Sequence, residues 1–179
     1  MQIPAITLEG CRRQDGAAQE ALYRICYPEM MRLALRYAQN SADAADILNR
    51  GLFKVLTKIE QFKGNDQNFG GWIKRIVVNE ALDFVRANPA FKQHQELDSA
   101  LNIAVDMPNQ EQASEAQNIT HLLQQLPLTT ATVFNLYALE GYSHREIGES
   151  LGISETNSKW HLHSARQKLQ QLIRSTATL

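Results

Sequence analysis

The sequence predicts an all-α fold made of two small helical domains joined by a flexible linker, the C-terminal one containing a helix-turn-helix. Apolar residues recur at spacings of three and four along most of the chain, and strand-like alternation is almost absent. A polar, acidic stretch interrupts this pattern once, near the middle. We therefore expect a first domain over residues 1–90, a linker over 91–112 and a second domain over 113–179. The 179 residues suffice for two small domains.

The first long helix is expected over residues 15–38. Its apolar face consists of Leu22, Ile25, Cys26, Met30, Leu33 and Tyr37. Asp15 is a fair N-cap. Pro28 lacks a backbone N–H, so it should bend this helix or split it.

Two further helices complete the expected first domain. Ser41 should cap a helix whose buried stripe is Ala45, Leu48, Leu52, Val55, Leu56 and Ile59. Turn residues follow over 63–68. A new helix then begins at Phe69, buries Ile73, Ile76, Val77, Ala81, Leu82 and Val85, and stops at Asn88-Pro89.

The expected linker concentrates the acidic residues. Residues 91–118 hold one basic and five acidic side chains, whereas residues 1–90 carry a charge of +2 and residues 119–179 a charge of +1. The whole chain has a formal net charge of −1. Because affinity for DNA comes largely from Lys and Arg on phosphates, DNA binding by the isolated chain should be weak.

Helical signals resume after residue 113. One helix over 114–126 ends at Pro127, and another over 129–140 ends at Gly141. Ser143 and Glu146 form a capping-box pattern at the start of the next helix, which Gly152 ends. Ser154 caps the last helix, over residues 155–174. A short helix, a tight turn with Gly and a longer helix predict a helix-turn-helix.

A helical wheel divides the last helix into two faces. The core face is expected to contain Ser158, Leu162, Ala165, Leu169, Leu172 and Ile173. The outward face contains Thr156, Trp160, His163, Ser164, Gln167 and Gln171, with Lys159 and Arg166 at the edge of the apolar stripe. Hydrogen-bonding and flat side chains flanked by cations are typical of a helix that reads the DNA major groove.

Several other classes of protein are disfavoured. Cys11 and Cys26 have no metal-ligand spacing, and we expect two buried thiols in a reducing compartment. No phosphate-binding loop, nucleophile elbow or metal motif is present, so we expect no enzyme, cofactor, metal or small-molecule substrate. The sequence lacks a membrane-length apolar run and an export signal, so we expect a cytoplasmic protein without direct membrane insertion.

Two stretches of the sequence resemble the extracytoplasmic-function (ECF) sigma factors of the bacterial sigma-70 class. "FKGNDQNFGGWIKRIVVNEALDFVR" is similar to an aromatic-Gly loop followed by W-[IL]-x-R-I-x-x-N-x-x-[IL]-D-x-x-R, and "LEGCRRQDGAAQEALYRICYPEMMRLALRY" is similar to the opening helices of that family. "LLQQLPLTTATVFNLYALEGYSHREIGESLGISETNSKWHLHSARQKL" matches its second domain, including Leu-Pro, EGYSH and the closing A-R-x-K-L. The resemblance implies a factor that directs core RNA polymerase to promoter DNA.

The resemblance implies that the first domain opens the −10 element and the second reads the −35 element. A loop from Phe62 to Gly71 would hold an unstacked base, with Phe69 among its contacts. Lys74 and Arg75 would contact phosphates, and Asn79 the non-template strand. This loop is one residue longer than is usual in the family.

The matched −35 positions in the last helix are Asn157, Lys159, Trp160, His163, Ser164 and Arg166. Lys159 and Arg166 would contact phosphates, while Trp160, His163 and Ser164 would read base edges. Ser164 replaces an Arg of many relatives, which implies a different −35 preference.

The polymerase-binding helix departs from the family pattern D-A-E-D-[IL]-[LV]-Q-[DE]. Here it reads "DAADILNR", which keeps Asp43 and Asp46 but places Asn49 and Arg50 where the family has Gln and an acid. Arg50 would repel a basic partner surface, at a cost on the order of a kcal/mol or more at a desolvated interface.

Other functions stay open beside this one. A free-standing helix-turn-helix regulator would dimerise and bind its operator unaided, but it leaves "FGGWIKRIVVN" unexplained. A degenerate sigma-like protein would bind only polymerase or an anti-sigma factor, and the substitutions at Asn49 and Arg50 favour it. The resemblance itself also implies an anti-sigma factor as a partner.

Overall fold

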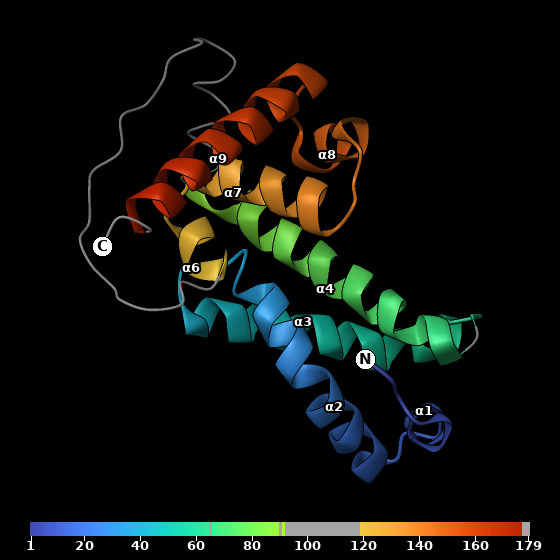
Figure 1. Ribbon diagram of the computed structural model, residues 1–179. Helices are drawn as coiled ribbons and strands as arrows, with labels where there is room; N and C mark the ends of the chain where they lie inside the picture. Colours follow the sequence, from blue (N-terminus) through green and yellow to red (C-terminus); the bar gives the residue numbers. More distant parts are fainter. Residues whose placement is uncertain (65, 90, 92–118, 177–179) are drawn as a thin grey trace. The chain divides into compact units, whose positions relative to one another are not determined.

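The computed structural model describes residues 1–64, 66–89, 91 and 119–176, and Figure 1 shows them as helices and connecting turns. These residues form no β-strand, in agreement with the predicted all-α fold. Contacts divide the chain into two units, Met1–Phe84 and Val85–Leu179. Apart from Phe91, the predicted linker 91–112 lies outside the described residues.

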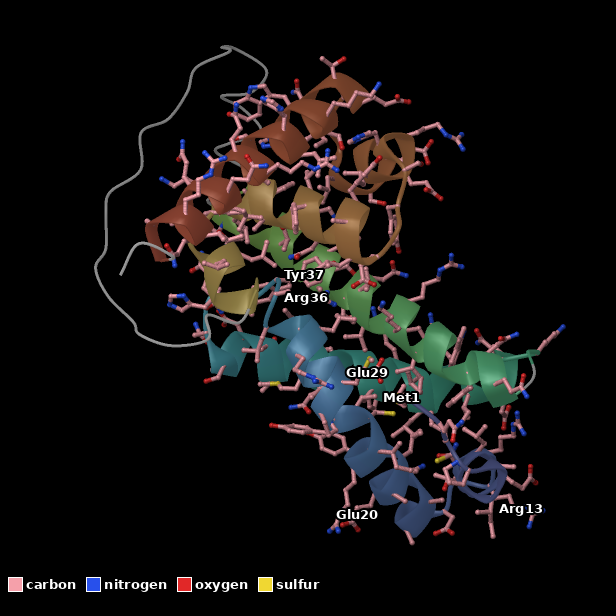
Figure 2. All side chains as sticks on the ribbon, in the orientation of Figure 1. Met1, Arg13, Glu20, Glu29, Arg36 and Tyr37 are labelled. Atoms are coloured by element: carbon pink, nitrogen blue, oxygen red, sulfur yellow. The ribbon has the colours of Figure 1, made fainter. Side chains whose placement is uncertain are left out.

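The first unit is built from α1 (Ala5–Arg12), α2 (Gly16–Ala34), α3 (Ser41–Lys58), a short 3-10 turn η1 (Ile59–Gln61) and α4 (Asp66–Ala87), which continues past the end of the unit. Helix α2 packs against both α1 and α3. The N-terminal ammonium of Met1 lies 3.4 Å from the carboxylate of Glu29 on α2. Figure 2 labels both residues. Helix α2 therefore lies between α1 and α3 in the packing of this unit.

Helix α2 follows the prediction in its cap and in its buried face. The Asp15 side chain accepts a hydrogen bond from the Ala17 N–H at 3.0 Å. Leu22, Cys26, Met30, Leu33 and, just beyond the helix end, Tyr37 are buried. Of the two effects predicted for Pro28, a bend or a split, the split does not occur, because the helix continues to Ala34.

The N-cap of α3 differs from the prediction. Asn40 replaces the expected Ser41: its side-chain oxygen accepts from the Asp43 N–H, and its amide donates to the Asp43 carboxylate, both at 2.9 Å. Asn and Ser are equally good caps. The acid three residues after Asn40 completes a reciprocal pair, which fixes the helix start one residue earlier.

Helix α4 begins earlier than predicted, at Asp66 and not at Phe69. Its buried residues include Ile73, Val77, Ala81, Leu82 and Val85, which are all in the predicted stripe. The ammonium of Lys54 on α3 pairs with Glu80 on α4, whose side chain is only 7% exposed. A buried carboxylate is costly without a partner, so this pair fixes α3 against α4.

The two cysteines are free and buried, as predicted. Cys11 lies on α1 and Cys26 on α2. Burial raises the pKa of both thiols, that of Cys26 to about 12. Both therefore serve as small apolar core residues.

The second unit contains α6 (Ile119–Gln124), α7 (Leu128–Phe134), a π-helical segment η2 (Asn135–Leu139), α8 (His144–Leu151) and α9 (Glu155–Thr176). Helix α9 contacts α6, α7 and α8, and Figure 1 shows it running across α7. A hydrophobic core cluster of this unit consists of Leu122, Leu123, Leu126, Ala131, Ala165 and Leu169.

The turn between α8 and α9 has the predicted geometry. Ser143 and Glu146 form a reciprocal capping box at the start of α8. Gly152 ends α8 in the left-handed region with φ 69°. The Ser154 hydroxyl accepts from the Asn157 N–H at 3.1 Å and caps α9. The helix-turn-helix expected from the sequence is confirmed.

Candidate functional site

The outward face of α9 presents an aromatic and polar surface. The side chain of Trp160 is 47% exposed, whereas Leu162 and Leu169 on the opposite side are 4% and 5% exposed. His163 is exposed and Ser164 is half-buried beside it. The predicted exposure of Trp160 is therefore confirmed. We call Trp160, His163 and Ser164 the reading face.

The two cations beside the reading face are held differently. The Lys159 ammonium lies 3.8 Å from the Glu155 carboxylate, one turn earlier on the helix. The Arg166 guanidinium lies over the ring of Tyr137, 5.9 Å from its centroid. Both cations are exposed, and within the part of the chain that the structure describes only Lys159 is paired with a carboxylate. Asn157 is half-buried at the start of the helix.

The buried face of α9 is rotated relative to the predicted stripe. Ile173, expected in the core, is 52% exposed, and His161 on the other edge of the stripe is only 3% exposed. The His161 Nδ1 atom and the Thr130 hydroxyl of α7 are hydrogen-bonded at 3.1 Å. This buried polar contact fixes the His161 side of α9 against α7, so the wheel was wrong for Ile173.

A cluster that the sequence did not predict supports the start of α9. The Tyr137 ring stacks on His144, with centroids 4.5 Å apart and planes at 23°. The His144 Nδ1 atom and the buried hydroxyl of Ser158 are hydrogen-bonded at 2.9 Å. Burial, followed by the charge of Lys159, lowers the pKa of His144. The cluster joins η2, α8 and α9, so no local pattern in the sequence reveals it.

The residues predicted to contact the −10 element lie on α4 with different exposure. Arg75 and Asn79 are exposed at i and i+4 and so share one face, while Lys74 is half-buried. Phe69 has no exposed surface. These positions place two of the four predicted side chains together on the surface.

The prediction for Phe69 and its loop needs correction. Residues 66–71 are helical, so no loop extends from Phe62 to Gly71. The Phe69 ring packs against Phe62 at a centroid distance of 4.9 Å and against Trp72 at 5.3 Å. An aromatic cluster stabilises itself by edge and face contacts, so Phe69 belongs to the core and is not available to a base.

The four residues predicted to bind polymerase make contacts within the chain. The Asp43 carboxylate accepts a hydrogen bond from the side-chain amide of Asn40, the N-cap residue of α3. The Asn49 side-chain oxygen accepts from the Tyr23 hydroxyl at 3.1 Å. Arg50 forms a two-pronged ion pair with Asp46, at 2.8 and 3.0 Å. The charge of Asp46 is therefore already compensated by Arg50.

Exposed aromatic side chains flank this face of α3, and the sequence did not single them out. Phe53, one turn after Asn49, is 68% exposed. Tyr23 and Tyr27 on α2 are 38% and 42% exposed, with ring centroids 5.8 Å apart. Phe53 lies next to the buried Leu52 in sequence, and its position outside the apolar stripe is the signal that could have revealed it.

The described residues contain neither a candidate metal site nor a candidate membrane span. No group of three or more His, Cys, Asp or Glu in this part of the chain could hold a metal ion. None of the helices that the structure describes has an apolar stretch long enough to cross a membrane.

Two family models match the chain. The model of sigma-70 region 2 matches residues 22–89, and the model of sigma-70 region 4 matches residues 116–169. Together they cover about two thirds of the sequence. The region 2 match includes the stretch that a free-standing regulator would leave unexplained.

The sequence is similar to those of known RNA polymerase sigma factors. ECF RNA polymerase sigma factor SigE of Mycolicibacterium smegmatis is 27% identical over 79% of this chain, and the match spans 56% of its own length. RNA polymerase sigma factor CarQ of Myxococcus xanthus is 26% identical over 90% of this chain and 94% of its own. The chain belongs to the sigma-70 family of RNA polymerase sigma factors, in its ECF group.

Solved structures share the fold. The sigma factor RpoE in complex with the anti-sigma factor NepR, from Bartonella quintana, aligns with a TM-score of 0.50 and 20% identity, over 87% of this chain and 96% of its own. CnrH in complex with the cytosolic domain of CnrY aligns with a TM-score of 0.50 and 19% identity, over 95% of this chain and 96% of its own.

Proposed function

We propose that this sigma factor reads the −35 element of its promoters with the reading face of α9. The observation that carries this proposal is the exposure of Trp160 on α9. The capped helix α8 and the turn at Gly152 precede this helix, as in a helix-turn-helix. Trp160, His163 and Ser164 offer a flat ring and hydrogen-bonding groups to base edges in the major groove. Lys159 and Arg166 contact the flanking phosphates, and Asn157 lies at the entry of the helix.

The first unit opens the −10 element through α4. Arg75 and Asn79 share an exposed face, which suits one phosphate contact and one contact to the edge of an unstacked base. Lys74 adds positive charge beside them. Phe69, with Phe62 and Trp72, supports this helix from inside the fold.

Core RNA polymerase binds the exposed face of α3 that contains Asp46, Asn49 and Arg50. In the free protein Arg50 compensates the charge of Asp46, and Asn49 is bonded to Tyr23. Binding through charge is therefore weakened at this face. Phe53 and the tyrosines supply apolar area for the contact, because exposed aromatic rings are favoured at the centre of interfaces.

The protein acts in the cytoplasm, without catalytic activity of its own, and is held inactive by an anti-sigma factor. Support for the last point comes from the two solved structures of similar fold, which are complexes of RpoE with an anti-sigma factor and of CnrH with the cytosolic domain of CnrY. Binding to polymerase makes up for the near-neutral charge of the chain, since tethering raises the effective concentration of promoter contacts.

Run-off transcription with purified cognate core polymerase and a library of genomic promoter fragments tests this function. The full-length chain should direct discrete transcripts from a small set of fragments that share a −35 sequence. Core polymerase without the chain is the control.

A second candidate function has specific support in the Asp46–Arg50 ion pair. A sigma-like protein that binds polymerase or an anti-sigma factor without directing transcription would give no discrete transcripts, whether or not core retains it in a pull-down. That result would contradict the proposed function.

A further inference from the structure

Tyr137 lies at the surface where three elements of the second unit, η2, α8 and α9, meet. It belongs to the π-helical segment η2, and its side chain is 37% exposed. Its ring stacks on His144 of α8 and carries the Arg166 guanidinium of α9 over its face. Neither the sequence motifs nor the proposed DNA contacts assign a role to this residue.

The backbone around Tyr137 is unusual. The Glu140 N–H donates to the Asn135 carbonyl at 3.0 Å, which closes a π-helical turn. Single π-helical turns are rare and occur often at functional sites. Asn135 and Leu136 are buried and anchor the segment, so Tyr137 is presented from a fixed part of the fold.

We propose that Tyr137 positions Arg166 for a DNA phosphate beside the reading face. A ring face attracts a guanidinium through its quadrupole and uses none of its N–H donors. Arg166 can thus be held in place and still offer its planar donor fork to a phosphate. This inference rests on the proposed function of α9.

Lys159 is held in a different way from Arg166, by an ion pair that competes with a phosphate. Its ammonium is paired with the Glu155 carboxylate, which must be displaced or shared when a phosphate arrives. Arg166 meets no such competitor in its contact with Tyr137. Holding a long cation by an aromatic face lowers the entropy lost on binding and leaves its charge uncompensated.

His144 and Ser158 fix the position of the Tyr137 ring relative to α9. The ring stacks on His144, and His144 is hydrogen-bonded to the Ser158 hydroxyl, which has no exposed surface. The Tyr137–His144 pair is therefore in contact with α9 at two residues, Arg166 and Ser158. Tyr137 is a positioning residue, because it acts on DNA only through Arg166.

A double-mutant cycle on holoenzyme tests the inference. The probe is the strongest promoter fragment recovered in the run-off selection, labelled with fluorescein, and the readout is its dissociation constant as a function of salt. Tyr137→Leu should weaken binding about two- to twelve-fold, the cost of ordering one long side chain when it binds. Tyr137→Phe should bind like the wild type, and Leu139→Ala, a change at a residue of equal exposure in the same segment, should have no effect.

The coupling to Arg166 distinguishes positioning from a structural role. Arg166→Ala should lower the slope of log Kd against log salt by about 1, as expected for the loss of one phosphate contact. In the Arg166→Ala background, Tyr137→Leu should cost nothing further. Tyr137→Gln provides a second variant if the unfolding temperature of Tyr137→Leu falls markedly.

The other outcomes separate a failure of the positioning role from a failure of the proposed phosphate contact. An equal loss for the Tyr137 variants with and without Arg166, or no loss in either background, overturns the positioning role while the proposed function stands. If wild-type holoenzyme selects no promoter, or if Arg166→Ala leaves the salt slope unchanged, the proposed phosphate contact fails, and the inference fails with it.

Discussion

At the scale of single residues, His144 joins the two helices of the helix-turn-helix. It stacks on Tyr137 of η2 and is hydrogen-bonded to Ser158 of α9. Burial and the charges of Lys159 and Arg166 lower its pKa, and the carboxylate of Glu155 opposes them. The neutral imidazole is therefore the form that the fold prefers.

This preference predicts a pH dependence of stability. The unfolded chain takes up a proton at His144 near pH 6.5, whereas the folded chain does so only at lower pH. The contribution of His144 is therefore complete above about pH 6.5 and is lost as the pH falls below it. Urea unfolding followed at about pH 7.5 and about pH 5.5 should show a larger loss for the wild type than for His144→Gln.

The glutamine variant is the control because it keeps a hydrogen-bonding group and cannot titrate. Other groups that titrate in this range contribute equally to both proteins and cancel in the comparison. Identical losses in the two proteins would show that His144 does not favour its neutral form.

At the scale of elements, the close approach within the helix-turn-helix depends on Gly148. A Cβ atom at this position would lie 2.7 Å from the backbone oxygen of Ile153. Backbone atoms in a tight turn cannot move aside cheaply. We therefore expect Gly148→Ala to lower the free energy of unfolding by about 1–3 kcal/mol.

Circular dichroism during chemical denaturation measures this effect. Gly71→Ala is the matched control, because a Cβ at this helical position meets nothing within 4 Å. That change should stabilise the protein by about 0.5–1 kcal/mol, the usual gain of Ala over Gly inside a helix. Equal stability of Gly148→Ala and the wild type would contradict the close contact.

The second element with a testable feature is α3, where Arg50 pairs with Asp46. Arg50→Glu removes the positive charge and frees the Asp46 carboxylate for a basic partner surface. Association with core polymerase should tighten by on the order of a kcal/mol or more, about five-fold or greater. A quantitative pull-down with cognate core measures the change.

Arg13→Glu provides the matched control for the charge reversal. Arg13 is also exposed and paired one turn away, with Glu9 at 2.9 Å, but it is the C-cap residue of α1. This variant should leave polymerase binding unchanged. If Arg50→Glu also leaves polymerase binding unchanged, Arg50 does not repel the polymerase surface at this face.

The elements also show how far the sequence predicts this fold. Caps depend on a few neighbouring residues, so Asp15, Ser143 with Glu146, Gly152 and Ser154 could be assigned from the sequence alone. The start of α4 could not, because residues 63–68 carry turn signals and the aromatic cluster of Phe62, Phe69 and Trp72 overrides them.

The site was predictable to a similar extent. The exposure of Trp160 follows from the helical period, which is a local property. The contacts of Tyr137 with His144 and Arg166 join three elements and become visible only in the folded chain. The Asp46–Arg50 pair has the i, i+4 spacing of a helical ion pair, so the sequence did contain that signal.

At the scale of the whole molecule, the charge of the chain indicates that it binds promoters together with a partner. Residues 119–179 carry a charge of only +1, and the whole chain −1. Few phosphates can be neutralised by such a chain on its own, so most of the affinity must come from the assembly with polymerase.

The most direct test compares run-off transcription by wild-type and Trp160→Ala holoenzymes on one selected promoter and on variants of its −35 element. Wild-type transcription should fall about five- to 150-fold for a change at a base that the reading face contacts. Trp160→Ala should lose this discrimination while still binding core polymerase. Wild-type transcription that ignores the −35 sequence, or full discrimination by Trp160→Ala, would contradict the role of this face in promoter reading.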